Sequence, residues 1–161
     1  MDISQLFRPE SVQSGITARS RKHALDIVSG LLARVSGNRL SATEAFDALV
    51  SRERLGCTAL GHAVAMPHGR VPGLERSVGA LLRLDTPVDF DTPDGEPVDL
   101  VFAVLVPEDY DPERDGELTA LARRCSEAQF RQRLRDAAGA RELHEVLASV
   151  ASEDVPRIAH G

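Results

Sequence analysis

The chain has 161 residues and a mass of 17.4 kDa, a size at which one domain buries roughly 70% of the surface of its unfolded chain. Hydrophobic residues make up 42% and charged residues 27% of the chain, which excludes a disordered, collagen-like or coiled-coil protein. Nineteen basic and 25 acidic residues give a net charge of −6, and the pI near 5.4 argues against a nucleic-acid-binding surface. We therefore expect a single soluble domain over residues 1–161 with no nucleic-acid partner.

The sequence predicts neither an export signal nor a membrane span. The first twelve residues, MDISQLFRPESV, lack the apolar segment of a signal peptide, and no apolar run approaches the roughly 18 residues needed to span a membrane. Cys57 and Cys125 are too few for a disulfide framework and do not have metal-ligand spacing. We expect a cytoplasmic protein without membrane insertion, metal or cofactor.

The first third of the chain predicts an arm followed by two helices. Residues 1–16 show no regular pattern and are expected to form an irregular arm. From residue 17 or 20 to Val35, apolar residues recur every three or four positions, which predicts an amphipathic helix. Ser41 and Glu44 form a capping box that begins a second helix ending near Arg54 or Leu55.

The middle of the chain predicts strands. Residues 63–66 form a short buried strand, followed by a tight turn at Gly69. Residues 77–84 and 98–106 are further strands, and the second is apolar almost throughout, as in a central strand covered on both faces. Between them, residues 86–97 predict a short edge strand and a turn at Asp94-Gly95.

The last third returns to helices. The expected elements are an acidic loop at 108–116, a helix at 118–125, a second capping box at Ser126 and Gln129 that begins a short helix, a last helix at about 140–150, and a polar tail at 152–161. Helices before and after a group of apolar strands predict an α/β fold, namely a single layered domain with a mixed β-sheet flanked by helices on both faces.

The segment MPHGR, residues 66–70, contains the best candidate for chemistry. Pro67 restricts Met66 to an extended backbone and Gly69 permits a sharp turn, so the two together fix the direction of the His68 side chain. A neutral imidazole nitrogen at the end of a rigid strand is a good nucleophile or ligand. From these residues alone, a solvated loop histidine remains the alternative.

The run RERLGCTALGHAVAMPHGR, residues 52–70, resembles the active-site segment of mannitol/fructose-type (type 2) enzyme IIA domains of the phosphoenolpyruvate phosphotransferase system (PTS). The nitrogen-regulatory branch, IIA-Ntr, is the most similar, since the run PVDLVFAVLVP is typical of it. The resemblance continues upstream in SRKHALDIVSGLLA and downstream in RQRLRDAAGARELHEVL, and so covers about the whole chain.

This resemblance implies a phosphohistidine carrier that acts in signalling. Such a carrier accepts a phosphoryl group from an HPr-type phosphocarrier protein (NPr) and regulates target proteins such as kinases or K+ transport proteins. His68 matches the phosphorylated nucleophile, Arg52 the active-site arginine, and Thr58 and Gly61 the loop before the strand. Gly69 belongs to the same phosphate-site segment, whereas Arg70 fits a charge at its rim. For Arg52, a solvated residue at a helix C-terminus remains the alternative.

The chain departs from the family where a second active-site histidine is usual. An ungapped count places Arg114 there, and matching the motif Glu117-Leu118-x-x-Leu121 instead places Glu117. We prefer the ungapped choice, with Arg114 as phosphate-site support. An arginine would keep the hydrogen-bond donor of the histidine, whereas a glutamate would repel phosphate. His62 is expected about 20 Å from His68, at the other end of a six-residue strand. Two alternatives to a regulatory carrier stay open: a sugar-specific IIA transporter subunit, and a regulatory binding module of the same fold that is not phosphorylated.

Overall fold

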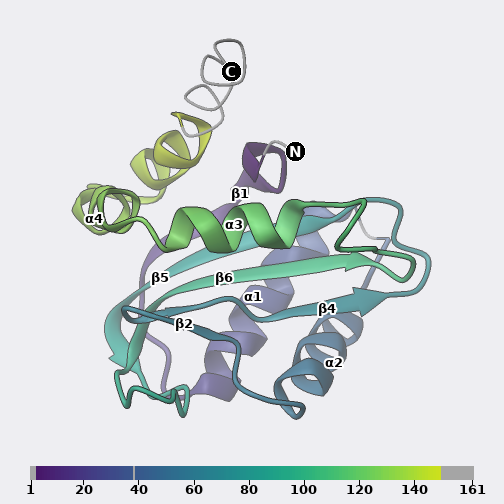
Figure 1. Ribbon diagram of the computed structural model, residues 1–161, viewed down its shortest axis with the longest axis horizontal. Coiled ribbons are helices and arrows are strands. Elements are labelled where there is room, and N and C mark those ends of the chain that lie inside the picture. The colour runs from purple at the N-terminus through teal and green to yellow at the C-terminus, as the bar shows by residue number, and fades with distance from the viewer. Residues whose placement is uncertain (1–2, 38, 150–161) are drawn as a thin grey trace.

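A computed structural model describes residues 3–37 and 39–149, which form a mixed six-stranded sheet with helices on both faces, as predicted (Figure 1). The strand order is β1-β5-β6-β3-β2, and β4 also pairs with β6. In chain order the elements are η1 (Ile3–Gln5), β1 (Phe7–Ile16), α1 (Arg21–Val35), α2 (Ala42–Glu53), β2 (Ala59–Gly61), β3 (Val64–Ala65), β4 (His68–Val71), β5 (Val78–Val88), β6 (Val98–Pro107), α3 (Glu117–Cys125), α4 (Ala128–Asp136) and a last helix over residues 140–149.

The central strand β6 joins the two halves of the core. From residue 100 to 106 its side chains alternate between two apolar clusters, one packed against α1 and α2, the other against α3, α4 and the last helix. Leu100, Phe102 and Val104 enter the second cluster, whereas Val101 and Ala103 enter the first. The near-continuous apolar run of this segment follows from burial on both faces, as expected.

The expectation of an irregular arm over residues 1–16 is wrong, because residues 7–16 form the edge strand β1. This strand pairs in parallel with β5, and the register shifts between Phe7 and Val12. Pro9 lies within that irregularity, where an edge strand tolerates a residue without an N–H group. Because of the shift, buried and exposed residues do not alternate along β1, and this alternation is the signal by which a strand is recognised in a sequence.

The two strands predicted between residues 77 and 97 need one correction. The expected strand at 77–84 and the separate edge strand around Val88 are one continuous strand, β5, that runs antiparallel to β6. The predicted turn at Asp94-Gly95 is confirmed, since the Gly95 amide donates to the carbonyl of Thr92 at 3.0 Å. Pro93 at the second position of this turn supplies the required φ angle.

The helices begin largely where the sequence predicts. Ser20 caps α1 by accepting from the His23 amide, and Ser41 and Glu44 form the capping box of α2. The predicted capping box at Ser126 is wrong: Ser126 ends α3 and donates to the carbonyl of Arg123, so α4 begins after Glu127 without a side-chain cap. The predicted tail at 152–161, like residue 150 of the last helix, lies outside the described residues.

Two further expectations concern the membrane and the cysteines. No helix in the described part of the chain is both long and apolar enough to cross a membrane. Cys57 and Cys125 are both free thiols. Burial raises the pKa of the Cys125 thiol to about 12, so this residue stays protonated and unreactive near neutral pH.

Candidate functional site

His68 begins strand β4, which lies beside β6 in the middle of the sheet. Val64 pairs with Leu100 and His68 with Val104, so residues 64–71 follow β6 in a single parallel register. The pairing pauses only at residues 66–67, where Pro67 lacks an N–H group but still accepts from the Val104 amide at 3.0 Å. The expected tight turn at Gly69 is therefore wrong, because the chain continues as a strand to Val71.

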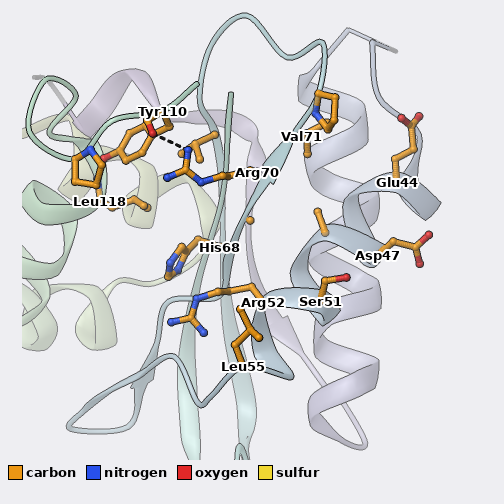
Figure 2. Close-up of a pocket in the computed structure, with 15 residues that line it drawn as sticks. Glu44, Asp47, Ser51, Arg52, Leu55, His68, Arg70, Val71, Tyr110 and Leu118 are labelled. Carbon is orange, nitrogen blue, oxygen red and sulfur yellow. Dashed lines mark hydrogen bonds between the residues drawn. The ribbon is translucent and has the colours of Figure 1, made fainter. Parts of the chain in front are cut away.

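The His68 ring is held in one tautomer by the backbone. Its Nδ1 lies 2.9 Å from the carbonyl oxygen of Met66. A carbonyl oxygen only accepts hydrogen bonds, so in the neutral ring the proton is on Nδ1 and the lone pair is on Nε2. Nε2 makes no hydrogen bond to any described residue, and the half-buried ring lies in a cleft (Figure 2).

Gly69 allows helix α2 to lie directly against β4. A Cβ atom at residue 69 would be 2.7 Å from the carbonyl oxygen of Ala48 and 2.9 Å from its carbonyl carbon. Ala48 and Arg52 are four residues apart and so share one face of α2. The close approach at Gly69 therefore places Arg52 in the same cleft as His68.

The cleft has a volume of about 710 Å³ and lies between α2, β4 and the loop that follows β6. Arg52 and Arg70 supply N–H donors to the cleft and His68 supplies the Nε2 lone pair, and Figure 2 shows all three side chains lining it. One N–H of Arg52 donates to the carbonyl of Gly56 at 3.1 Å, and its other N–H groups make no hydrogen bond to the described residues. Leu55, 83% exposed, lies at the rim. The arrangement combines a nucleophilic nitrogen with positive charge in an open, partly apolar site.

Arg70 reaches across the cleft to the loop formed by residues 108–116. Its Nη1 donates to the carbonyl oxygens of Glu108 at 3.0 Å and Tyr110 at 2.6 Å. Its guanidinium also lies 5.9 Å from the centre of the Tyr110 ring, within the range of a cation–π contact. Arg70 thus contacts the loop directly, which is more than the rim position expected from the sequence.

Thr58 lies behind the site and not in the cleft. Its hydroxyl donates to the Glu53 carboxylate, and its carbonyl accepts from the Met66 amide at 3.0 Å. Met66 in turn holds the His68 ring. The other oxygen of the Glu53 carboxylate is buried without a hydrogen bond, 3.8 Å from Nη1 of Arg21. The Thr58 hydroxyl thus bonds to Glu53 outside the cleft, and only its main chain is linked to the segment that contains His68.

Gly61 and His62 lie at the far end of this segment, outside the cleft. Gly61, at φ +85°, ends β2, and His62 and Ala63 form the hairpin turn to β3 with φ angles of 56° and 65°. His62 lines a separate hollow with Arg131 and Arg135, and its carbonyl accepts from Arg135 at 2.7 Å. The structure brings neither Gly61 nor His62 together with His68. The strand between the two histidines, β3, is also shorter than the six residues expected.

We expect Ala63→Gly to stabilise the protein. An alanine in the left-handed region is strained, and replacing it with glycine should raise the free energy of unfolding by about 0.5–1 kcal/mol after the entropy cost of glycine. Urea unfolding followed by circular dichroism measures the change. Ala33→Gly in α1 is the matched control and should be destabilising, because Ala33 has ordinary helical geometry. Equal losses in both variants would contradict the prediction.

The two candidates for the position of the second histidine lie outside the cleft. Arg114 and Glu117 line a different hollow, together with His144. The Arg114 guanidinium is held by the Asp115 carboxylate at 2.8 Å and by the carbonyl of Asp109 at 2.9 Å. Neither residue is brought to His68, and no other histidine of the described chain lines the cleft.

Tyr110 and Leu118 line the cleft but are not singled out by the sequence. Tyr110 is buried, and its hydroxyl accepts from the Leu118 amide at 3.2 Å, which joins the loop to the start of α3. Burial raises the pKa of the Tyr110 hydroxyl. Tyr110 could have been found from the sequence as the aromatic residue within the acidic stretch 108–116, because an aromatic side chain in a charged loop is commonly buried against the domain.

The described residues contain no group of three or more histidine, cysteine or acidic side chains placed to hold a metal ion. A histidine with a free Nε2 in one cleft with two arginines combines a nucleophilic nitrogen with groups that bind anionic oxygens.

Residues 5–150 match the family model described as the phosphoenolpyruvate-dependent sugar phosphotransferase system, EIIA 2. The chain belongs to this family of PTS enzyme IIA domains, as its sequence predicts. Within the family it is similar to nitrogen regulatory proteins. It is 38% identical over 148 residues to one from Bradyrhizobium diazoefficiens, covering 92% of this chain and 95% of that protein. It is 36% identical over 155 residues to one from Klebsiella oxytoca, covering 96% and 94%.

The solved structures agree with this placement. The nitrogen regulatory protein IIA-Ntr from Neisseria meningitidis superposes with a TM-score of 0.82 at 36% identity, over 90% of this chain and 98% of that one. The mannitol IIA protein of Escherichia coli has the same fold, with a TM-score of 0.69 at 21% identity over 88% and 98% of the two chains. Sequence and structure thus both place the chain in the nitrogen-regulatory branch.

Proposed function

We propose that this protein is a phosphohistidine carrier of the nitrogen-related phosphotransferase system, and that it accepts a phosphoryl group on Nε2 of His68. The donor is an HPr-type phosphocarrier protein carrying its own phosphohistidine, and the carrier regulates target proteins according to its phosphorylation state. The observation that carries the proposal is the hydrogen bond from His68 Nδ1 to Met66, which leaves the Nε2 lone pair in the cleft.

The transfer needs no general acid or base in this cleft. The Nε2 lone pair attacks phosphorus, the P–N bond to the donor histidine breaks, and the electron pair of that bond returns to the donor ring. The proton on Nδ1 of His68 stays on that nitrogen throughout, because the Met66 carbonyl holds it. Phosphoryl transfer depends mainly on position and charge compensation, both of which a fixed ring and nearby guanidinium groups provide.

Arg52 is the proposed charge partner of the phosphoryl group. Arg52 lies on α2 in the same cleft, and all but one of its N–H donors are available to bind a ligand. Guanidinium groups bind phosphoryl oxygens through strong charge-assisted hydrogen bonds. Thr58 and Gly69 act indirectly, Thr58 through the backbone that holds His68 and Gly69 through the close approach of α2. Arg114 and Gly61 lie outside the cleft, and the proposed mechanism does not use them.

Phosphorylation with a complete donor system tests the proposal. The protein is incubated with enzyme I, an HPr-type carrier and phosphoenolpyruvate, and its intact mass is measured at neutral pH. We expect one added phosphoryl group on the unaltered protein, none on His68→Ala, and one on the control His62→Asn, whose side chain lies outside the cleft. No uptake, or uptake by His68→Ala, would overturn the proposal.

A second candidate function is a regulatory binding module of the same fold that is not phosphorylated. It is favoured by one observation, that His68 is the sole histidine lining the cleft among the described residues. The same experiment separates the two functions, since this module would take up no phosphoryl group. A sugar-specific transporter subunit is less favoured, because the chain is 38% identical to a nitrogen regulatory protein and 31% identical to a fructose-specific EIIA component from Haloferax volcanii, of which it covers 96%.

A further inference from the structure

Arg70 is placed between His68 and the acidic loop at 108–116. Residues 68 and 70 are two positions apart on β4, so their side chains lie on one face of the strand, with Cα atoms about 6.6 Å apart. The burial pattern agrees, since Gly69 and Val71 are buried while Arg70 is exposed. Figure 2 shows the Arg70 guanidinium near Tyr110, on the side of the cleft that also contains His68.

The Arg70 guanidinium has N–H donors that its contacts with the loop do not use. Both hydrogen bonds to the loop, to the carbonyls of Glu108 and Tyr110, come from Nη1. The N–H groups of Nε and Nη2 make no hydrogen bond to the described residues. A guanidinium can hold two partners at once because its five N–H groups point in fixed, different directions.

We propose that Arg70 is a positioning residue that transmits the phosphorylation state of His68 to the 108–116 loop. The inference rests on the proposed function. When Nε2 carries the phosphoryl group, the free N–H groups of Arg70 bind its oxygens while Nη1 keeps the two loop carbonyls. The side chain is then fixed at both ends, and the loop opens less often than in the unphosphorylated protein.

The loop is suited to present this difference to another protein. It carries five carboxylates, and Tyr110 and Pro112 from it line the cleft. Several of its hydrogen bonds are internal, such as those that join Arg114 and the Asp111 amide to Asp115. Arg70 adds a link from the loop to the sheet beside the phosphorylated residue. A partner that docks over the cleft would therefore meet a loop whose order depends on the phosphoryl group.

Hydrogen–deuterium exchange of the loop amides tests the inference. Peptides covering 108–116 are compared between phosphorylated and unphosphorylated protein, labelled at neutral pH, with phosphorylation verified by intact mass in a parallel sample. We expect phosphorylation to slow exchange of the loop by about fivefold or more, the lower end of ordinary coupling between sites. The slowing should disappear in Arg70→Gln and persist in Arg54→Gln, a charge-matched control that lies away from the cleft.

The outcomes separate this inference from the proposed function. If no phosphoryl group is found, the proposed function fails and the inference with it. If the protein is phosphorylated but loop exchange does not slow, or slows equally in Arg70→Gln, the inference alone is overturned. Should Arg70→Gln take up no phosphoryl group, Arg70→Lys replaces it. The three N–H donors of a lysine all sit on one compact ammonium and lack the planar fork with which arginine reaches two partners in different directions, so undiminished slowing in that variant would overturn the inference.

Discussion

Gly69→Ala is expected to lower the free energy of unfolding by about 2 kcal/mol, within the usual cost of overpacking. The added methyl group would lie 2.7 Å from the backbone carbonyl oxygen of Ala48, which no change of rotamer can move. Relief requires α2 to shift away from β4. Because Arg52 is one turn further along the same face of α2, the shift would also displace this arginine from His68.

Urea unfolding measures the loss, and Gly30→Ala is the matched control. Gly30 lies within α1, and a Cβ atom there would meet no atom within 4 Å. Its replacement should therefore stabilise the protein by about 0.5–1 kcal/mol through helix propensity. A Gly69→Ala protein as stable as the unaltered one would show that α2 does not pack against β4 as closely as the structure indicates.

Local signals in the sequence account for most of the fold. Caps and apolar periodicity locate α1 and α2 to within a few residues, since these helices are specified by nearby side chains. The central strand β6 is recognised because both of its faces are buried. The strand β1 is missed because its pairing with β5 depends on a register shift around Pro9, and such a shift is determined by the partner strand and not by local sequence.

The site is predicted less completely than the fold, for a similar reason. His68 and Arg52 are both named from the segment 52–70, and the structure brings them into one cleft. The sequence also singles out Gly69, but as a turn residue. In the structure Gly69 is instead required because α2 approaches β4 too closely for a Cβ atom. That role depends on Ala48, 21 positions earlier in the chain, and cannot be read from the neighbours of Gly69.

The position of Arg114 illustrates the same limit. Sequence spacing alone places it at the position of the second family histidine, yet its guanidinium is held by Asp115, the next residue, and lines another hollow. Arg70, considered only a rim charge, makes two hydrogen bonds to the loop. The direction of the Arg70 side chain is decided by partners far along the chain, and that of Arg114 by the neighbouring carboxylate, and the family spacing reveals neither.

Arg52→Ala is expected to slow phosphoryl transfer to His68 by about 100-fold, the usual cost of removing one preorganised donor from developing negative charge. Effects on folding should be small, because the one hydrogen bond lost, to the carbonyl of Gly56, is exposed. Rapid-quench measurements with a phosphorylated HPr-type carrier give the rate, and urea unfolding gives the stability of each variant.

Arg54→Ala supplies the matched control for this measurement. Arg54 is exposed and lines the hollow between α1 and α2, so its removal changes the net charge equally without altering the cleft. If both variants slow the transfer to the same extent, Arg52 acts only through long-range charge. A loss confined to Arg52→Ala, partly restored in Arg52→Lys, would instead indicate direct contact with the phosphoryl oxygens, since lysine keeps the charge but not the planar pair of donors.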